Sequence, residues 1–418
     1  MSTAPLPPGR SGLPLLGETL AFAKNPFRFI DERLAAHGRI FRTHVLGRKT
    51  VVVAGPEAAA RFIDGSVVLR EGSMPPHVQE LFGGRSVPQL DGDVHAARKR
   101  VVLQAFTHEA MAAYLPVIRS AIERYFAAWS GAGEIRWLDD MKRLAIEVIC
   151  TTFAGLPVGE EMDRLRRDYD VLTSGFVTLP INVPGTPYCM ALKERDRILA
   201  VLRRIVRERR AAPANDGLSR ILGAAADVSD DDLALELHHI VIAGFIVYGE
   251  LAAIVRQLTE HPELRARLAA ESDPFSAPML QFVNEVKRVT PIVQVVFGKT
   301  QKAFELDGVA VPQGWMVMWA VTPSHTTHGV YSDPARFDPE RFSPARGEER
   351  RHEHAFAPQG AGPVTGHRCP GLDFATYFMA LFTVELLRQT WELPPQNFDY
   401  DWSKTPPEIT DRLRARSV

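Results

Sequence analysis

Cysteine is scarce in this chain, which carries Cys150, Cys189 and Cys369 among its 418 residues. An odd and sparse set of thiols does not suit a disulfide framework and favours a reducing compartment. Iron–sulfur clusters take four protein ligands, so these cysteines do not house one. The sequence therefore leaves room for a function that rests on a single cysteine.

An excess of either charge is also absent, because 49 basic residues balance 50 acidic ones. Electrostatics therefore give no reason to expect a nucleic acid partner. Residues 1–10 lack the apolar run of about 7–15 residues found in signal peptides. No apolar stretch approaches the roughly 20 residues that cross a bilayer. We expect a soluble, cytoplasmic protein without a membrane anchor.

Linkers and internal repeats are lacking too: no Pro/Gly/Ser-rich segment divides the chain, and no period of about 20–50 residues recurs. An extended Pro-rich arm at 1–12 comes first. Residues 40–55 and 292–320 predict short strands with turns at Leu46 and at Leu306-Asp-Gly. We predict one mainly α domain with a small β part, spanning residues 1–418. The clearest amphipathic helical stretches are 93–130, 138–155 and 188–212.

What the chain does contain is a glycine-rich segment, 356–371, called the cysteine loop here. It presents Cys369 after His367 and Arg368 and just before an apolar helix. Backbone N–H groups, nearby cations and a following helix N-terminus all stabilise a thiolate. That combination suits an axial sulfur ligand to haem iron. The alternative is a buried structural cysteine.

Two charged motifs precede this loop. Glu285 and Arg288 stand at i and i+3 on one helical face, and Arg341 follows in Phe337-Asp-Pro-Glu-Arg-Phe342. Taken singly, each could be a solvated surface charge. The order Glu-x-x-Arg, Pro-Glu-Arg-Phe and then the cysteine loop resembles the cytochrome P450 family. The resemblance implies that fold, haem b with Cys369 as metal ligand, and a buried charge triad of Glu285, Arg288 and Arg341.

The resemblance extends over nearly the whole chain. Asp91-Gly-Asp-Val-His95 and Lys99 resemble the helix that contacts the haem propionates, which implies that His95, Lys99 and His367 reach those carboxylates. Residues 184–195 look like the retinoid- and sterol-oxidising branch. The cysteine loop, in contrast, is similar to that of fatty-acid peroxygenases.

The longest helix candidate runs from Ser229 or Asp230 to His261, where Pro262 stops it. Its middle, residues 239–250, is apolar on all sides, as in a fully buried helix. Gly244 and Gly249 suggest that something approaches the backbone there. Close helix packing would explain both glycines. If haem binds as the resemblance implies, a flat macrocycle against Ala243 and Gly244 is the better account.

The same helix departs from the family at the positions that deliver protons to dioxygen. An acid and a Thr usually follow Ala-Gly-x, whereas this chain has Ile246 and Val247, which neither donate nor accept protons. Glu250 lies one turn further on the same face and could act as a displaced acid. The alternative is a helix charge paired with Arg256 or a neighbour. His239 and Tyr248 are expected to be core residues, although His239, one turn before Ala243, could also face the pocket.

The leading hypothesis is a haem-thiolate monooxygenase that oxidises a hydrophobic small molecule such as a terpenoid, lipid or secondary metabolite, using O2 and electrons from a separate ferredoxin. Segments 73–82 and 173–183 occupy the pocket-capping regions of the family and are mainly apolar. Arg350, Arg351 and Arg368 would form a basic face for the donor. The Arg-Pro that holds fatty acids in the peroxygenases is absent. Peroxide use, a redox-neutral rearrangement and a haem-binding sensor remain the alternatives.

Overall fold

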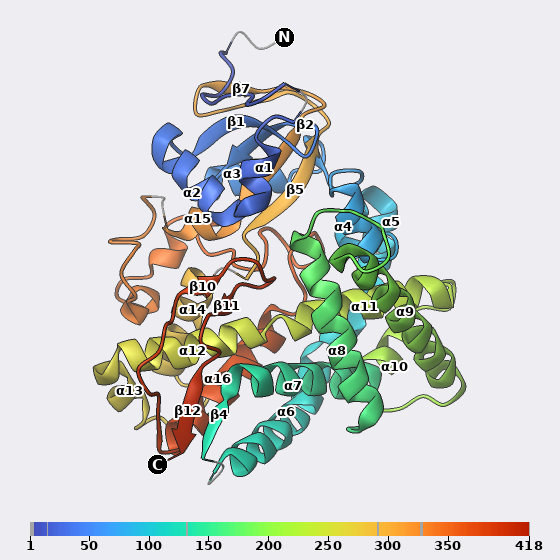
Figure 1. Cartoon of the computed structure of the whole chain (residues 1–418), viewed down its shortest axis with the longest axis vertical. Coiled ribbons are helices and arrows are strands. Elements are labelled where there is room, and N and C mark those ends of the chain that lie inside the picture. Colours follow the sequence, from blue (N-terminus) through green and yellow to red (C-terminus); the bar gives the residue numbers. More distant parts are fainter. Residues whose placement is uncertain (1–3, 15, 131–132, 291, 327–328, 418) are drawn as a thin grey trace. The chain divides into compact units, whose positions relative to one another are not determined.

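The computed structural model describes residues 4–14, 16–130, 133–290, 292–326 and 329–417 (Figure 1). The chain is mainly helical, and it forms two compact units that are interleaved along the sequence. The sheet unit comprises Met1–Glu80, Arg85–Lys99 and Val293–Cys369. The helical unit comprises Leu81–Gly84, Arg100–Ile292 and Pro370–Val418.

A five-stranded sheet of order β1-β2-β8-β5-β3 forms the centre of the sheet unit. Only the pairing of β2 with β8 is parallel among the strand pairs of this sheet. The first hairpin turns at Leu46 and Gly47, both with positive φ, as the sequence predicted. The strands are β1 (Ile40–Val45), β2 (Arg48–Val53), β8 (Met316–Ala320), β5 (Val295–Thr300) and β3 (Val68–Leu69).

The two faces of this sheet pack against different elements. Val51 and Val53 point to one face, where Phe62 of α3 (Pro56–Ile63) lies against Trp319, with ring centroids 5.8 Å apart. Val52 points to the other face, with residues of α1 (Thr19–Lys24) and α2 (Pro26–His37). The period of two along β2 thus supplies both cores.

The second predicted hairpin also forms, as β6 (Phe304–Leu306) and β7 (Val309–Val311). Asp307 and Gly308 both have positive φ, the turn conformation that an Asp-Gly pair favours. The Pro-rich arm is extended where described: the carbonyls of Pro5 and Pro8 accept hydrogen bonds from the backbone of Ala310 and Arg42. The prediction for residues 1–3 lies outside the described residues.

The helical unit contains most of the helices. In it α8 packs on α9, α11 on α9 and α7, and α16 on α6 (Figure 1). The predicted stretch 93–130 is divided at Thr107, whose side chain accepts a hydrogen bond from the Ala110 N–H and caps α6. The helices are α6 (His108–Trp129), α7 (Trp137–Ile149), α8 (Glu160–Ser174), α9 (Pro187–Ala211), α10 (Gly217–Leu222), α11 (Asp230–Phe245), α12 (Tyr248–Glu260), α13 (Pro262–Leu268), α14 (Ala277–Val289) and α16 (Leu372–Arg388).

Short strands also occur in the helical unit, and these the sequence did not predict. A three-stranded sheet has the order β4-β12-β9, and β10 pairs with β11. The strands are two to four residues long, too short to show a period of two in the sequence. Their bounds are β4 (Glu134–Arg136), β9 (Trp391–Glu392), β10 (Tyr400–Asp401), β11 (Glu408–Ile409) and β12 (Arg414–Ser417).

The long central helix is interrupted, which corrects the prediction of one continuous helix. Its start is as expected, since the Ser229 side chain accepts from the Asp232 N–H. At Ile246 and Val247 the backbone tightens: Val247 N–H donates to the Gly244 carbonyl and Gly249 N–H to the Ile246 carbonyl, both i→i+3. This local 3₁₀ geometry separates α11 from α12.

The glycines of this helix have packing reasons. A Cβ on Gly244 would lie 2.2 Å from Ile149 Cδ1 of α7, and one on Gly249 would lie 2.8 Å from Ile292 Cδ1. Close packing therefore accounts for both glycines. If haem binds, the sequence had favoured the other explanation, a flat macrocycle against the helix.

By length and composition Asp230–Glu260 could cross a bilayer, contrary to the prediction that no stretch could. However, 83% of its apolar window is buried within the protein, as in a core helix.

Candidate functional site

The cysteine loop of the sheet unit is folded tightly around Cys369. The Cys369 N–H donates to the Gln359 carbonyl at 3.0 Å, which closes the loop onto its own start. Gly360 and Gly362 have φ of +98° and +84°, a region that L side chains rarely adopt. A Cβ on Gly362 would also lie 3.0 Å from Ile63. The glycines are thus required by both conformation and space.

Cys369 differs from the other two thiols in exposure. Cys150 and Cys189 are buried, whereas Cys369 is half-buried. Burial raises the pKa of Cys150 to about 12, which keeps that thiol protonated. A metal ligand must be a thiolate with access to its metal. Of the three cysteines, Cys369 has the exposure that such a ligand needs.

A histidine that the sequence analysis missed supports the same loop. His325 is 1% exposed, and its Nε2 accepts a hydrogen bond from the Ala357 N–H at 3.0 Å. Phe356, which directly precedes Ala357, also contacts a neighbouring segment: its ring lies 4.9 Å from that of Phe342. His325 belongs to no motif that the sequence analysis used, so it was missed.

Basic side chains gather beside this loop in a set that we call the cationic cluster: Arg70, His95, Lys99 and His367. The rings of His95 and His367 lie 4.1 Å apart. Lys99 Nζ donates to the Arg368 carbonyl at 2.6 Å, so α5 (Gly92–Val102), which carries His95 and Lys99, is tied to the cysteine loop. The sequence predicted that His95, Lys99 and His367 act together, and the structure places them together. Arg70 was missed because it follows a two-residue strand without a motif.

One carboxylate, Asp91, accompanies the cationic cluster. It accepts hydrogen bonds from the backbone N–H groups of Arg70 and Glu71, and His367 Nε2 lies 3.6 Å from its Oδ1. Burial opposes ionisation of Asp91, but His367 and these N–H groups bring its pKa below the ordinary value. Asp91 thus holds Arg70 and His367 in place.

The pKa values of His95 and Arg70 are both lowered, mainly by burial. Burial, followed by the charges of His367 and Lys99, lowers the pKa of His95 to about 4. Burial lowers the pKa of Arg70 to about 9, although Asp91 opposes the shift. His95 Nε2 is buried and has no hydrogen-bond partner within the described part of the chain. A buried ring nitrogen without a partner, in a cluster of basic side chains, fits the carboxylates of a haem group.

The predicted charge triad is distributed over both units. Glu285 and Arg288 are fully buried in the helical unit, and Arg288 donates to both carboxylate oxygens of Glu285 at 2.7 and 2.8 Å. Arg341 is fully buried in the sheet unit, where it donates to Glu348 at 3.0 Å and to three backbone carbonyls. Their burial excludes the surface-charge alternative. The mutual pairing of all three stays a prediction.

Glu348 is a partner of Arg341 that sequence reading missed. It is 1% exposed and also binds Arg346 and the Ser332 N–H. Burial opposes its charge, yet the hydrogen bonds from Arg346, Ser332 and Arg341 lower the pKa of Glu348 to about 2. Arg341 is therefore paired with a permanent carboxylate at neutral pH.

Glu250 is buried in the first turn of α12, next to the interruption at Ile246 and Val247. Its Oε2 has no hydrogen-bond partner among the residues that the structure describes. Burial raises the pKa of Glu250, and the positive charge of Lys287 partly opposes this shift. The alternative was a charge paired with Arg256 or a neighbour. Arg256 binds Glu260 at 2.9 Å instead, and the neighbouring cation that acts on Glu250 is Lys287.

Lys287, the cation that acts on Glu250, is itself buried in α14. Its Nζ donates to the Leu372 carbonyl at 3.1 Å and to Thr376 Oγ1 at 2.8 Å, both in α16. The helix that follows the cysteine loop in sequence is thus linked through Lys287 to the neighbourhood of Glu250. Sequence reading treated Lys287 as a spacer between Glu285 and Arg288.

The neighbouring His239 and Tyr248 differ in their surroundings. Tyr248 is 1% exposed and donates to Glu408 at 3.0 Å, which is the core position that the sequence predicted. His239 is half-buried, and its ring lies 5.5 Å from Phe82, which in turn stacks on Phe176 at 5.1 Å. An aromatic group thus lines α11 one turn before Ala243.

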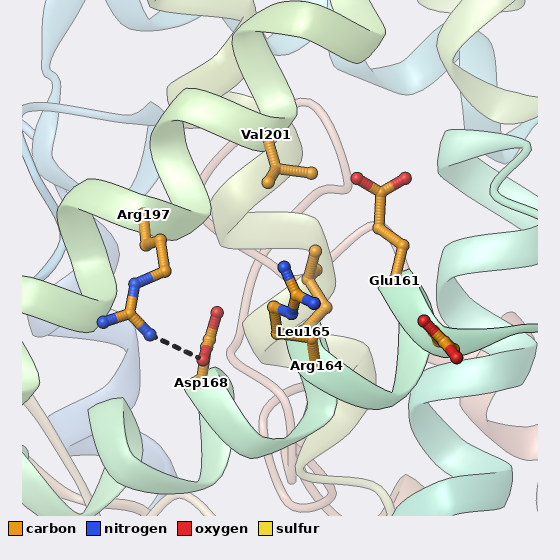
Figure 2. A pocket seen from close by; sticks show the side chains of 7 residues that line it. Glu161, Arg164, Leu165, Asp168, Arg197 and Val201 are labelled. Atoms are coloured by element: carbon orange, nitrogen blue, oxygen red, sulfur yellow. Dashed lines mark hydrogen bonds and ion pairs between the residues drawn. The ribbon is translucent and has the colours of Figure 1, made fainter.

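A separate groove of about 370 Å³ lies between α8 and α9 (Figure 2). Arg197 bridges to Asp168 at 3.5 Å on one side, and Glu161 and Arg164 lie on the other. Acidic and basic side chains alternate around this groove, so it has no dominant charge. None of the predicted site residues lines it.

The family model for cytochrome P450 matches residues 7–408. This chain belongs to the cytochrome P450 family. It is therefore an oxidoreductase of the haem-thiolate monooxygenase type, whose cofactor is haem held by an axial cysteine thiolate. The predicted fold class is confirmed at the same time.

Similar proteins lie in several branches of the cytochrome P450 family. The chain is 27% identical to abscisic acid 8'-hydroxylase 1 of Arabidopsis thaliana, over 94% of this chain and 87% of that protein. The structure of retinoic acid-bound cyanobacterial CYP120A1 is 28% identical and covers 99% of both chains, with a TM-score of 0.89. Cytochrome P450SP alpha (CYP152B1) in complex with (R)-ibuprophen is 25% identical, covers 98% of both chains and has a TM-score of 0.86. The mixture of branches that the motifs indicated is confirmed.

Proposed function

We propose that this cytochrome P450 oxidises a hydrophobic small molecule with O2, using Cys369 as the thiolate ligand of haem b. The observation that supports the ligand most is the contrast in exposure: Cys369 is half-buried in a tight loop beside cations, while Cys150 and Cys189 are buried. When bound, haem supplies the iron centre at which the oxidant is activated. The protein's own residues then hold the cofactor, orient the substrate and control protons.

Retention of haem is assigned to the cationic cluster. His95 and His367 would donate to the propionates, with Arg70 contributing its guanidinium charge. Lys99 would act mainly by fixing the cysteine loop through the Arg368 carbonyl. Charge-assisted hydrogen bonds of this kind are roughly twice as strong as neutral ones.

Proton supply is assigned to Glu250, because Ile246 and Val247 at the helix interruption cannot exchange protons. A carboxyl group whose pKa is raised by burial stays protonated up to a higher pH than an ordinary Glu. It can therefore give that proton to water at the interruption and be reprotonated. Ala243 and Gly244 would border the oxidant side of the haem, as in the family.

The proposed substrate is an apolar molecule of terpenoid or lipid type. The names of similar proteins refer to abscisic acid and retinoic acid, which are apolar carboxylic acids. Segments 73–82 and 173–183 are mainly apolar and would cap the substrate. Electrons would come from a separate ferredoxin at a face containing Arg350, Arg351 and Arg368, in the cytoplasm.

The assignment of Cys369 is tested by the spectrum of the reduced CO complex. Cys369→Ala should abolish the Soret band typical of thiolate ligation, while Cys150→Ala and Cys189→Ala should retain it. Survival of that band in Cys369→Ala, with its loss in either control, would assign the ligand elsewhere. A wild-type protein that binds haem and CO but turns over no substrate would favour the sensor alternative.

A second candidate is a peroxide-dependent peroxygenase, or an isomerase with no net redox change. Ile246 and Val247 favour it, because they remove the usual proton route. Product formation with O2 and a donor, compared with peroxide alone, separates the two. If the monooxygenase is correct, Glu250→Gln should lower O2-driven turnover by about 10²–10⁴-fold and spare substrate-induced spectral shifts. Activity with peroxide only, unchanged in Glu250→Gln, would make the enzyme a peroxygenase.

A further inference from the structure

The sheet unit contains a pocket of about 380 Å³ at the end of its five-stranded sheet. We call it the basic pocket, because Arg48, Lys49 and Lys299 line it and no carboxylate does. The remaining lining is formed by Trp315, Met316 and three glycines, at positions 72, 298 and 314. None of these residues has a part in the haem site described above.

Strand register explains why the three cations meet. The middle strand here is β8, with β2 on one side and β5 on the other. Met316 at its start pairs with Thr50 of β2 and with Lys299 of β5. Lys49 directly precedes Thr50, so Lys49 and Lys299 approach the start of β8 from opposite sides.

Arg48 and Lys49 are held at the pocket by different contacts. Arg48 donates through NH1 to the Gly72 carbonyl at 2.9 Å and the Ser73 carbonyl at 3.3 Å, which fixes its guanidinium against the 72–73 segment. Lys49 Nζ lies 5.6 Å from the centroid of the Trp315 ring. Neither contact neutralises a charge.

The lack of counter-charges is unusual for this protein, whose basic and acidic residues are nearly equal in number. Within the described residues, Arg48, Lys49 and Lys299 form no ion pair with a carboxylate. The groove between α8 and α9 shows the contrast, because there Asp168 faces Arg197 and Glu161 lies near Arg164 (Figure 2). Two pockets of similar size thus differ in charge.

We propose that the basic pocket binds a small, multiply charged oxyanion, the chemistry shared by phosphate esters and polycarboxylic acids. Three unbalanced cations match two or three negative charges, and a guanidinium can bind such a group through two parallel hydrogen bonds. A Cβ on Gly72 or Gly314 would meet nothing within 4 Å, so the backbone is open to an anion at both positions. The volume falls within the range of small-molecule sites. This site is separate from the oxidation chemistry.

Calorimetric titration of the holoenzyme at low ionic strength tests the proposal directly. Pyrophosphate and citrate serve as probes of the two sources, inorganic phosphate as the minimal dianion and acetate as a monoanion. The variant is Lys49→Gln combined with Lys299→Gln, since both side chains are exposed and neither forms an ion pair with a carboxylate among the described residues. We expect it to weaken pyrophosphate or citrate binding by about tenfold or more. Whichever of these two binds more tightly to the wild type identifies the source.

The control is Arg164→Gln in the α8–α9 groove. It removes one positive charge from the protein, against two in the double variant, but none from the basic pocket. It should leave anion affinity unchanged, and the CO spectrum of each variant shows that the haem protein is intact. Equal affinity in the double variant and the wild type would overturn the proposal. So would equal binding of acetate and the multivalent anions, or equal weakening by Arg164→Gln, because either would indicate non-specific attraction.

Discussion

At the scale of single residues, burial and charge oppose each other throughout the cationic cluster. Water would stabilise the charged form of each of these basic groups, but Arg70 and His95 are almost fully removed from it. Such groups persist in native proteins when a partner is present to compensate. In the proposed site the haem carboxylates would be these partners, so loss of a donor should appear first in cofactor retention.

The first prediction concerns His95. His95→Phe should speed haem loss by roughly 10–100-fold, because a hydrogen bond to a charged group contributes about 1.5–3 kcal/mol. Transfer of haem to an excess of an apo-haemoprotein measures the rate. Val94→Ala on the same helix is the control, since Val94 is exposed. Equal rates in His95→Phe and the wild type would remove His95 from the site.

The second prediction concerns Glu348 and acid stability. Its folded pKa is about 2, below the ordinary value of 4.5. The stabilisation from this group is therefore fully present above pH 4.5 and is lost as the pH falls towards 2. Glu348→Gln should lower the melting temperature at pH 7. The difference in melting temperature between this variant and the wild type should become smaller as the solution is acidified below pH 4.5.

Melting curves between pH 7 and pH 3 test this prediction. Glu353→Gln is the control, because Glu353 is exposed in the same segment. A constant difference in melting temperature between Glu348→Gln and the wild type across this range would contradict the prediction.

At the scale of elements, sequence predicted the hairpins better than the central helix. Leu46-Gly47 and Asp307-Gly308 are local turn signals, so their strands could be placed without tertiary information. The interruption at Ile246 and Val247 has no proline or cap to mark it. It results from a change in backbone hydrogen bonding inside a uniformly apolar segment, where periodicity is uninformative.

Candidate site residues divide in the same way. Cys369, His95 and Glu285 stand in motifs with fixed spacing, so the resemblance identified them. The residues that contact Arg70 and Lys287 come from segments distant in sequence. A single buried basic residue has no motif around it in the sequence. The motifs therefore predicted a ligand, Cys369, which stays a prediction. They did not reveal Arg70 or Lys287.

The third prediction concerns the packing of α11 on α7. Gly244→Ala should destabilise the protein by about 1–3 kcal/mol, because the added Cβ overlaps Ile149. Ile149→Ala in the same chain should recover part of that loss, which a double-mutant cycle of unfolding free energies measures. Gly223→Ala is the control, since a Cβ there makes ordinary contacts only. Additive losses from Gly244→Ala and Ile149→Ala would show that the two residues do not compete for space.

At the scale of the whole molecule, each unit contains a fully buried guanidinium–carboxylate pair. Exposed pairs add about 0–1 kcal/mol, whereas removing one partner of a buried pair costs about 3–5 kcal/mol. The fourth prediction is that Glu285→Ala yields protein without bound haem, measured as the ratio of Soret to protein absorbance. Glu208→Ala, which breaks an exposed i,i+4 pair with Arg204, should leave that ratio unchanged. Haem-replete Glu285→Ala protein would refute the prediction.

The interleaving of the two units also determines when the fold can be completed during synthesis. β2 ends at Val53 and its parallel neighbour β8 begins at Met316, so about 260 residues separate two paired strands. At about 5–20 residues per second, a ribosome leaves the β1–β2 hairpin without that neighbour for roughly 13–52 s. Cys369 emerges later still, after the helices up to α14. A nascent chain therefore exposes an unpaired β2 edge until the sheet closes, and a chaperone that shields this edge should raise the yield of haem-loaded enzyme.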